Sequence, residues 1–360
     1  MDRGETQDVG TRLAGGEVTL TQNSENHPRG WRLLQGLVWT IGLGLVVLLL
    51  AWPVAGLHAF WNILIPVAPV LVAVAPGLWR NVCPLASTAL VARHVGFSNR
   101  RQLSRQAQGR LLLGGVILLF LIVPLRHVIL DTSSAGTAIT LILIAILSAN
   151  LGTHFEWKSA WCSGLCPVHG VERLYGSEPA FTFDNAHCTE CARCVSMCPD
   201  STPGADPLLD VNSGRPQRIA GFLMIGAFPG FVWGWFHVPD WRGIEGWRHL
   251  DVAYGIPLGA GLVTLIAFAA ILPWVHGDVR RFLVRIFAAA AIACYYWYRV
   301  PALFGFGPLP GDGMLVDLRG TLPESFPFWC RVLTTTFFAW WLVGRRGGRR
   351  AWARRPAFEA

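Results

Sequence analysis

Long apolar runs separated by short polar loops dominate the pattern along the chain. The runs lie at about 33–54, 57–78, 111–130, 136–153, 219–237, 253–275, 282–304 and 327–344. Crossing a bilayer as a helix takes about 20 residues, and most of the runs are long enough. The pattern therefore predicts an all-α polytopic membrane protein with about eight transmembrane helices.

Composition supports this prediction. Charged residues make up 14% of the 360 residues and hydrophobic residues 52%, whereas charged residues average about 25% in soluble domains. The net charge of +8 comes almost entirely from arginines in short loops beside apolar runs. Because that distribution is typical of a topogenic signal, we expect the lipid bilayer and not a nucleic acid as the partner of the basic residues.

The basic residues also predict an orientation. Arginine-rich loops follow the second, fourth and sixth runs, and an arginine-rich segment ends the chain. The intervening loops carry few basic residues. Because basic loops stay on the cytoplasmic side, we expect a multi-pass protein of the cell inner membrane with cytoplasmic N- and C-termini. The first apolar run is too long for the hydrophobic part of a signal peptide, which has about 7–15 residues.

These features divide the chain into five parts. They are a flexible cytoplasmic tail at 1–30, a membrane domain with helices one to four at 31–153, a cytoplasmic segment at 154–218, a membrane domain with helices five to eight at 219–344, and a basic cytoplasmic tail at 345–360. The segment 154–218 is rich in charge and in turn residues. A segment this small has little core of its own, so bound clusters and the adjoining helix ends are expected to hold it folded.

Four closely spaced cysteines lie in that segment: Cys188, Cys191, Cys194 and Cys198. With the proline that follows, their spacing is C-x2-C-x2-C-x3-C-P, the bacterial-ferredoxin pattern for a [4Fe–4S] cluster. Soft thiolate ligands suit iron in this form. A zinc site favours two separated C-x2-C pairs, and disulfides need an oxidising compartment. An iron–sulfur centre is therefore the favoured interpretation.

Three further cysteines lie at the predicted cytoplasmic ends of helices two and four: Cys83, Cys162 and Cys166. In two-cluster ferredoxins the proline-flanked cysteine of each motif completes the other motif's cluster. By that logic Cys166 would complete the cluster of the first three motif cysteines, and Cys198 would join Cys162 and Cys83 at a second.

Seven cysteines for eight ligand positions leave one position unfilled. His187, His169 or water could fill it, or a single cluster is present. Buried thiols at a helix end are the alternative interpretation of Cys162 and Cys166. The sequence thus predicts one or two [4Fe–4S] clusters.

Together, these motifs and the candidate helices resemble the polytopic membrane ferredoxins. That family includes the quinol-oxidising membrane subunit of periplasmic nitrate reductase, the membrane flavoprotein that supports nitrous-oxide reductase, and the iron–sulfur protein of cytochrome-oxidase copper maturation. The resemblance covers roughly residues 57–200 and implies membrane helices with a small ferredoxin-like insert between helices four and five. Those relatives carry two complete copies of each cysteine motif, whereas this chain carries one.

The cysteines and the resemblance predict a membrane-bound iron–sulfur electron-transfer protein, a subunit of an oxidoreductase system rather than a stand-alone enzyme. Electrons would pass between the quinone pool or a cytoplasmic donor and a partner redox protein. The alternative is an accessory or regulatory iron–sulfur protein for metalloenzyme maturation, acting by metal reduction or redox sensing. The sequence contains no nucleotide-binding or hydrolase motif, so no catalytic residue is assigned.

Histidines are the next candidates for cofactor binding. Four fall near the predicted outward-facing helix ends and could bind a metal, a haem or a quinone headgroup: His58, His127, His237 and His249. On the cytoplasmic side, His154 and His276 with Arg280 and Arg281 are candidate neighbours of a quinone. Ordinary interface anchoring is the competing interpretation of both sets, and it is the one we favour.

Overall fold

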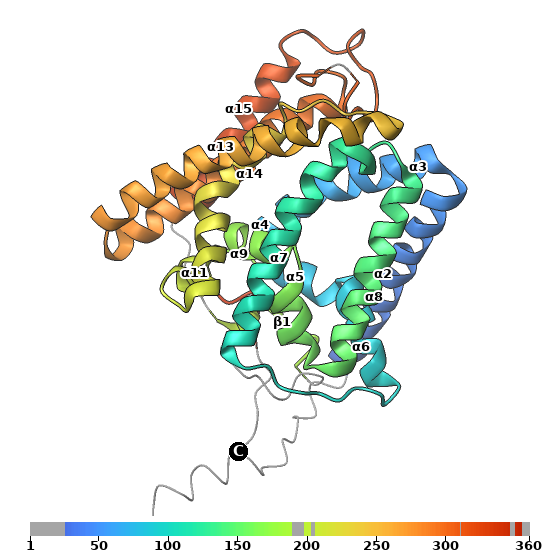
Figure 1. Cartoon of the computed structure of the whole chain (residues 1–360), viewed down its shortest axis with the longest axis vertical. Helices are drawn as coiled ribbons and strands as arrows, with labels where there is room; N and C mark the ends of the chain where they lie inside the picture. Colours follow the sequence, from blue (N-terminus) through green and yellow to red (C-terminus); the bar gives the residue numbers. More distant parts are fainter. Residues whose placement is uncertain (1–25, 189–197, 203–205, 310, 346–349, 355–360) are drawn as a thin grey trace, which may run out of the picture.

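The computed structural model describes residues 26–188, 198–202, 206–309, 311–345 and 350–354. Most of the predicted N-terminal tail and parts of the C-terminal tail lie outside the described residues. The first half contains α2 Asn26–Ala51, α3 Pro53–Leu57, η2 His58–Leu64, α4 Ile65–Val74, α5 Pro76–Val82, α6 Pro84–His94, α7 Arg105–Leu125, η3 Arg126–Leu130 and α8 Ser134–His154. The η elements are π or 3-10 helical segments, and most of them continue a neighbouring α-helix. Figure 1 shows how the labelled α-helices are arranged.

The segment after α8 is built from short elements. They are η4 Lys158–Leu165, α9 His169–Tyr175, β1 Phe183–Asp184, η5 Pro199–Ser201 and α10 Leu208–Val211. The second half contains α11 Arg215–Phe222, η6 Leu223–Ala227, α12 Phe228–Trp235, η7 Gly243–His249, α13 Leu250–Ile271, η8 Leu272–Trp274, α14 Gly277–Leu303, α15 Phe326–Ala339, η9 Trp340–Gly344 and β2 Ala353–Arg354.

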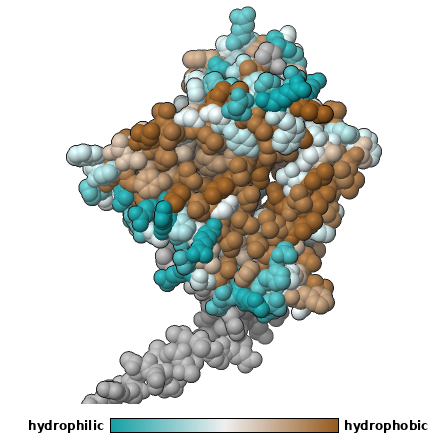
Figure 2. All heavy atoms as spheres, in the orientation of Figure 1, coloured by the Kyte–Doolittle hydropathy of each residue, from teal (hydrophilic) through white to brown (hydrophobic). Residues whose placement is uncertain are grey.

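Helices occupy every apolar run that the sequence predicts, so the prediction of a mostly helical protein is confirmed. Five described segments are long and apolar enough to cross a membrane: Arg29–Ala51, Pro53–Val74, Arg105–Leu130, Ser134–His154 and Gly243–Trp274. A broad hydrophobic surface covers the middle of the face seen in Figure 2, with hydrophilic residues at its borders. The architecture is therefore compatible with a lipid bilayer.

One boundary differs from the prediction. The apolar run expected at 57–78 ends as a helix at Val74, and a new helix begins at Pro76. Ala75 between them has φ −140° and ψ 61°, outside the helical region. A proline disfavours the helical conformation of the residue before it, whereas hydropathy does not register such a break. The break separates the apolar α4 from α5, which leads to Cys83.

Side-chain caps and close backbone contacts fix the central helices. The Oγ atoms of Ser104 and Ser133 accept hydrogen bonds from backbone N–H groups three residues later, at 3.2 and 3.1 Å, and so start α7 and α8. Near its end, α8 packs directly on α6. A Cβ atom on Gly152 would overlap the carbonyl oxygen of Ala89. Glycine is therefore required at this crossing.

The main core lies among α4, α7, η6, α12, α13 and α14. Ile225, Phe231, Phe268 and Ile292 are fully buried there. Leu174 of α9 belongs to the same core, and α9 contacts α4, α7 and α14. The segment after α8 thus shares the core of the helices, as we expect for a segment with few apolar residues of its own.

Candidate functional site

Cys83, Cys162 and Cys166 lie in one apolar cluster with Trp157 and Trp161. Cys83 links α5 to α6, whereas Cys162 lies within η4 and Cys166 ends it. Cys166 is buried and the other two are half-buried. Burial raises the pKa of all three thiols. Without a bound cation, these sulfur atoms are therefore protonated at neutral pH.

The three cysteines that precede a proline have nearly the same backbone conformation. Their φ and ψ angles are −57° and 121° at Cys83, −60° and 119° at Cys166, and −66° and 118° at Cys198. The proline disfavours the helical conformation of each cysteine. Pro84 and Pro199 then begin the helical elements α6 and η5. The sequence similarity among the three Cys-Pro pairs is therefore also a structural similarity.

Four cysteines were predicted to form the ferredoxin loop, and two of them, Cys191 and Cys194, lie outside the described residues. Cys188 is half-buried and Cys198 is buried. Among the described residues, no three His, Cys, Asp or Glu side chains could hold a metal ion.

Arg80 connects the segments that carry the cysteines. Its side chain is only 6% exposed, and its Nε atom lies 2.6 Å from Oδ1 of Asp200, two residues after Cys198. Nη1 forms an ion pair with Glu172 of α9 and donates to the carbonyl oxygen of Cys162 at 3.3 Å. One buried guanidinium thus links the residues that follow the ferredoxin loop to η4 and α9.

A second cation completes the charge balance. Nζ of Lys158 lies 2.6 Å from Oδ2 of Asp200, and both side chains are buried. Burial disfavours ionisation of Asp200, but Arg80 and Lys158 outweigh it and hold the pKa of this carboxyl well below its usual range. For Glu172, Arg80 likewise outweighs burial and lowers the pKa. Two cations and two carboxylates therefore form a buried ionic network beside the cysteines.

His169 and His187, the predicted candidates for the remaining ligand position, lie in the same region. Nδ1 of His169 lies 3.2 Å from Nη1 of Arg80 and 3.4 Å from Oε2 of Glu172. Nε2 of His187 faces the carbonyl oxygen of Arg80 at 3.3 Å, which leaves its Nδ1 unprotonated. Burial lowers the pKa of His169 to about 4 and that of His187 to about 3. Both imidazoles are therefore neutral at pH 7.

The C-terminal segment also contributes to the site, whereas the sequence predicts only a basic tail there. β2 pairs in parallel with β1, and Trp352 beside it is only 1% exposed. Its Nε1 donates to the carbonyl oxygen of Gly176 at 2.6 Å. The guanidinium of Arg80 lies over its ring, 5.6 Å from the ring centre. The tryptophan in this arginine-rich terminus could have indicated the packing. A side chain as large and apolar as tryptophan is more stable when it is buried than when it lies in an exposed tail.

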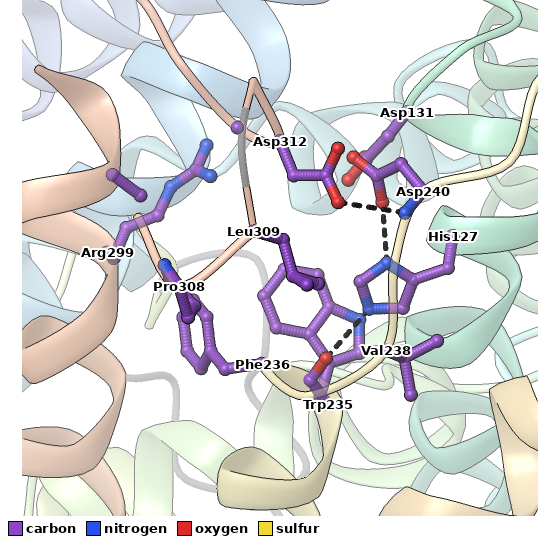
Figure 3. Close-up of a pocket in the computed structure, with 12 residues that line it drawn as sticks. His127, Asp131, Trp235, Phe236, Val238, Asp240, Arg299, Pro308, Leu309 and Asp312 are labelled. Atoms are coloured by element: carbon purple, nitrogen blue, oxygen red, sulfur yellow. Dashed lines mark hydrogen bonds and ion pairs between the residues drawn. The ribbon is translucent and has the colours of Figure 1, made fainter. Parts of the chain in front are cut away.

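A second polar site lies beyond the other end of α7, where His127, Asp240, Asp312 and Arg299 line a cavity (Figure 3). Nε2 of His127 is 2.9 Å from the carbonyl oxygen of Trp235, and Nδ1 is 2.5 Å from Oδ1 of Asp240. These two contacts fix the orientation of the imidazole ring. The backbone N–H of Asp240 donates to Asp312 at 2.9 Å.

The cavity measures about 30 Å³, which is room for about two water molecules. It is too small for a quinone headgroup or a haem. The other three outward histidines have local partners: His58 contacts Asn62, His237 contacts the carbonyl oxygen of Trp233, and His249 stacks on Trp241. This geometry agrees with the interface interpretation of these histidines.

The reactive groups that the structure brings together are therefore thiols. They lie in an apolar cluster beside a charge-balanced ionic network. Comparison with known proteins gives no match to a protein-family model, to a curated protein or to a solved structure.

Proposed function

We propose that this chain is a membrane-bound iron–sulfur electron-transfer protein that holds at least one [4Fe–4S] cluster. The observation that supports it is the gathering of Cys83, Cys162 and Cys166 beside a network that also holds the residues following Cys198. These cysteines come from the α5–α6 junction and from η4, and Cys198 precedes a residue of the same ionic network. A cluster with ligands from several segments requires such convergence.

In this proposal the ferredoxin loop supplies Cys188, Cys191 and Cys194 to one cluster, with a Cys-Pro cysteine as its fourth ligand. The thiolates of the remaining cysteines hold a second cluster if a further group fills the eighth ligand position. A bound cluster supplies one-electron redox chemistry. The surrounding apolar side chains would exclude water from the cluster.

The proposal places about eight helices in the inner membrane, with the cysteines and both termini on the cytoplasmic side. The hydrocarbon core is about 30 Å thick, so a cluster at one face needs a mobile carrier or a partner subunit to pass electrons onward. Quinone is the carrier proposed. The small cavity beside His127 is not its site, because the cavity holds only water-sized molecules.

Reduction by quinol tests this function. Protein in liposomes, prepared without oxygen, is mixed rapidly with a quinol, and bleaching of the cluster absorbance is followed. We expect bleaching in the wild type and in Cys330→Ser, whose thiol lies in α15 away from the cysteine cluster, and none in Cys191→Ser. A cluster that is present but exchanges no electrons with quinol or with a redox partner would instead favour the maturation or sensing role.

A further inference from the structure

Four exposed arginines lie where α7 and α11 begin: Arg105, Arg110, Arg215 and Arg218. The two helix starts are in contact. Nε2 of Gln217 donates to the carbonyl oxygen of Arg105 at 3.1 Å, and a Cβ atom on Gly109 would overlap the Gln217 side chain. Two segments more than 100 residues apart in sequence thus form one basic patch, which we call the α7–α11 patch.

The described residues do not balance the charge of this patch. Within the part of the chain that the structure describes, none of the four arginines contacts a carboxylate. Neither α7 nor α11 has an acidic residue in its first turn. The start of a helix already carries partial positive charge, so arginines there increase the local potential. The balancing anions must come from outside the described chain.

The surroundings of the patch indicate where those anions lie. Ile219 directly follows Arg218 and is 42% exposed, and Ile117 and Leu121 on α7 are exposed to a similar degree. Arg105–Leu130 is one of the candidate membrane spans. Hydrophilic residues border the broad hydrophobic surface of the molecule (Figure 2). The arginines therefore lie next to apolar surface that suits lipid chains.

We propose that the α7–α11 patch binds the phosphate groups of anionic phospholipids at the bilayer surface. The planar guanidinium groups can each donate two parallel hydrogen bonds to a phosphate. This inference goes beyond the electron-transfer role and does not depend on the cluster. It also differs from the role of basic loops in setting membrane orientation. It requires that anionic lipids, and not other lipids, stabilise the folded protein.

The test is a titration of the purified, detergent-solubilised full chain, with Tm as the readout. Phosphatidylglycerol should raise Tm, whereas phosphatidylcholine and inorganic phosphate should not. The double variant R215Q/R218Q should weaken the apparent affinity for phosphatidylglycerol about 25-fold, since each arginine near an anionic surface contributes roughly a fivefold gain. The control R242Q/R248Q, which removes two exposed arginines near η7, should bind like the wild type.

Iron and sulfide content should be unchanged in R215Q/R218Q, which separates this proposal from the electron-transfer role. Should that variant fail to fold, a salt titration of the wild type serves instead, because salt screens exposed charges and should abolish the phosphatidylglycerol effect. Equal stabilisation by phosphatidylcholine, equal stabilisation by free phosphate, or an equal loss in the control variant would each overturn the proposal.

Discussion

The Nε atom of Arg80 lies 2.6 Å from Oδ1 of Asp200, although 119 residues separate them in the chain. Arg80 stands three residues before Cys83, and Asp200 stands two residues after Cys198. Through this ion pair, the Cys83-Pro84 unit between α5 and α6 is held beside the residues that follow Cys198. The pair is buried, so its loss affects stability more than the loss of a surface pair would.

Replacing Arg80 by Gln should therefore destabilise the fold strongly. The change leaves Asp200 and Glu172 buried with less compensating charge, which costs about 3–5 kcal/mol in comparable buried pairs. Arg80→Lys should recover only part of the loss, because an ammonium group cannot reach all the partners of the guanidinium. Thermal unfolding in detergent measures the effect, with the exposed Arg242→Gln as control. Equal stability of the Arg80 and Arg242 glutamine variants would contradict the structural role of Arg80.

Trp352 should anchor the C-terminal segment to the cysteine-bearing region. Trp352→Ala removes a fully buried side chain and should cost about 3–5 kcal/mol. Trp274→Ala is the matched control, since that side chain is 85% exposed and its loss should cost little. Limited proteolysis provides a local readout, because the C-terminus should become susceptible in Trp352→Ala. If both variants behave like the wild type, the C-terminal segment does not pack as described.

Gly152 should be intolerant of any side chain. Gly152→Ala places a methyl group against the carbonyl oxygen of Ala89 and should force α6 and α8 apart, at a cost of about 1–3 kcal/mol. Gly44→Ala in α2 is the control, because no atom lies within 4 Å of the added methyl group. That variant should gain up to about 1 kcal/mol from helix propensity. Unfolding measurements that show no difference between the two variants would refute the close α6–α8 crossing.

Stability should fall in mild acid because of His169. In the folded protein, burial lowers the pKa of this imidazole to about 4 from an ordinary value of 6.5. Below about pH 6.5 the unfolded chain therefore binds a proton that the folded chain excludes, and the free energy of unfolding decreases until about pH 4. The slope from this group is at most about 1.4 kcal/mol per pH unit.

His169→Gln should remove the part of the pH dependence of the unfolding free energy that comes from this imidazole. The comparison is between variant and wild type prepared with the same iron content, unfolded at pH 7 and at pH 5. An identical pH dependence in the two proteins would show that His169 does not remain neutral in the folded state.

The helices could be predicted from the sequence because hydropathy is a local property, and all eight apolar runs are helical in the structure. The break before Pro76 was missed, although the proline itself was the signal. The Arg80–Asp200 pair could not be predicted. Charged residues are normally exposed, and a single sequence does not indicate which arginine approaches which carboxylate.

For the candidate site, the residue types were predictable but their arrangement was not. The Cys-Pro spacing singled out Cys83 and Cys166, and the structure places both in one cluster with Cys162. The ligand exchange predicted from ferredoxins would separate Cys166 from the other two, and that assignment stays a prediction because Cys191 and Cys194 lie outside the described residues. The contribution of Trp352 depends on a parallel strand pairing across the chain, for which no local pattern exists.

The most direct measurement is the iron and acid-labile sulfide content of the anaerobically purified full chain, combined with low-temperature EPR after reduction. The proposed function predicts about four or about eight atoms of each per chain, according to the number of clusters, and a reduced-cluster signal that is lost in Cys191→Ser. A colourless protein without iron, or one that contains zinc in place of iron, would contradict it.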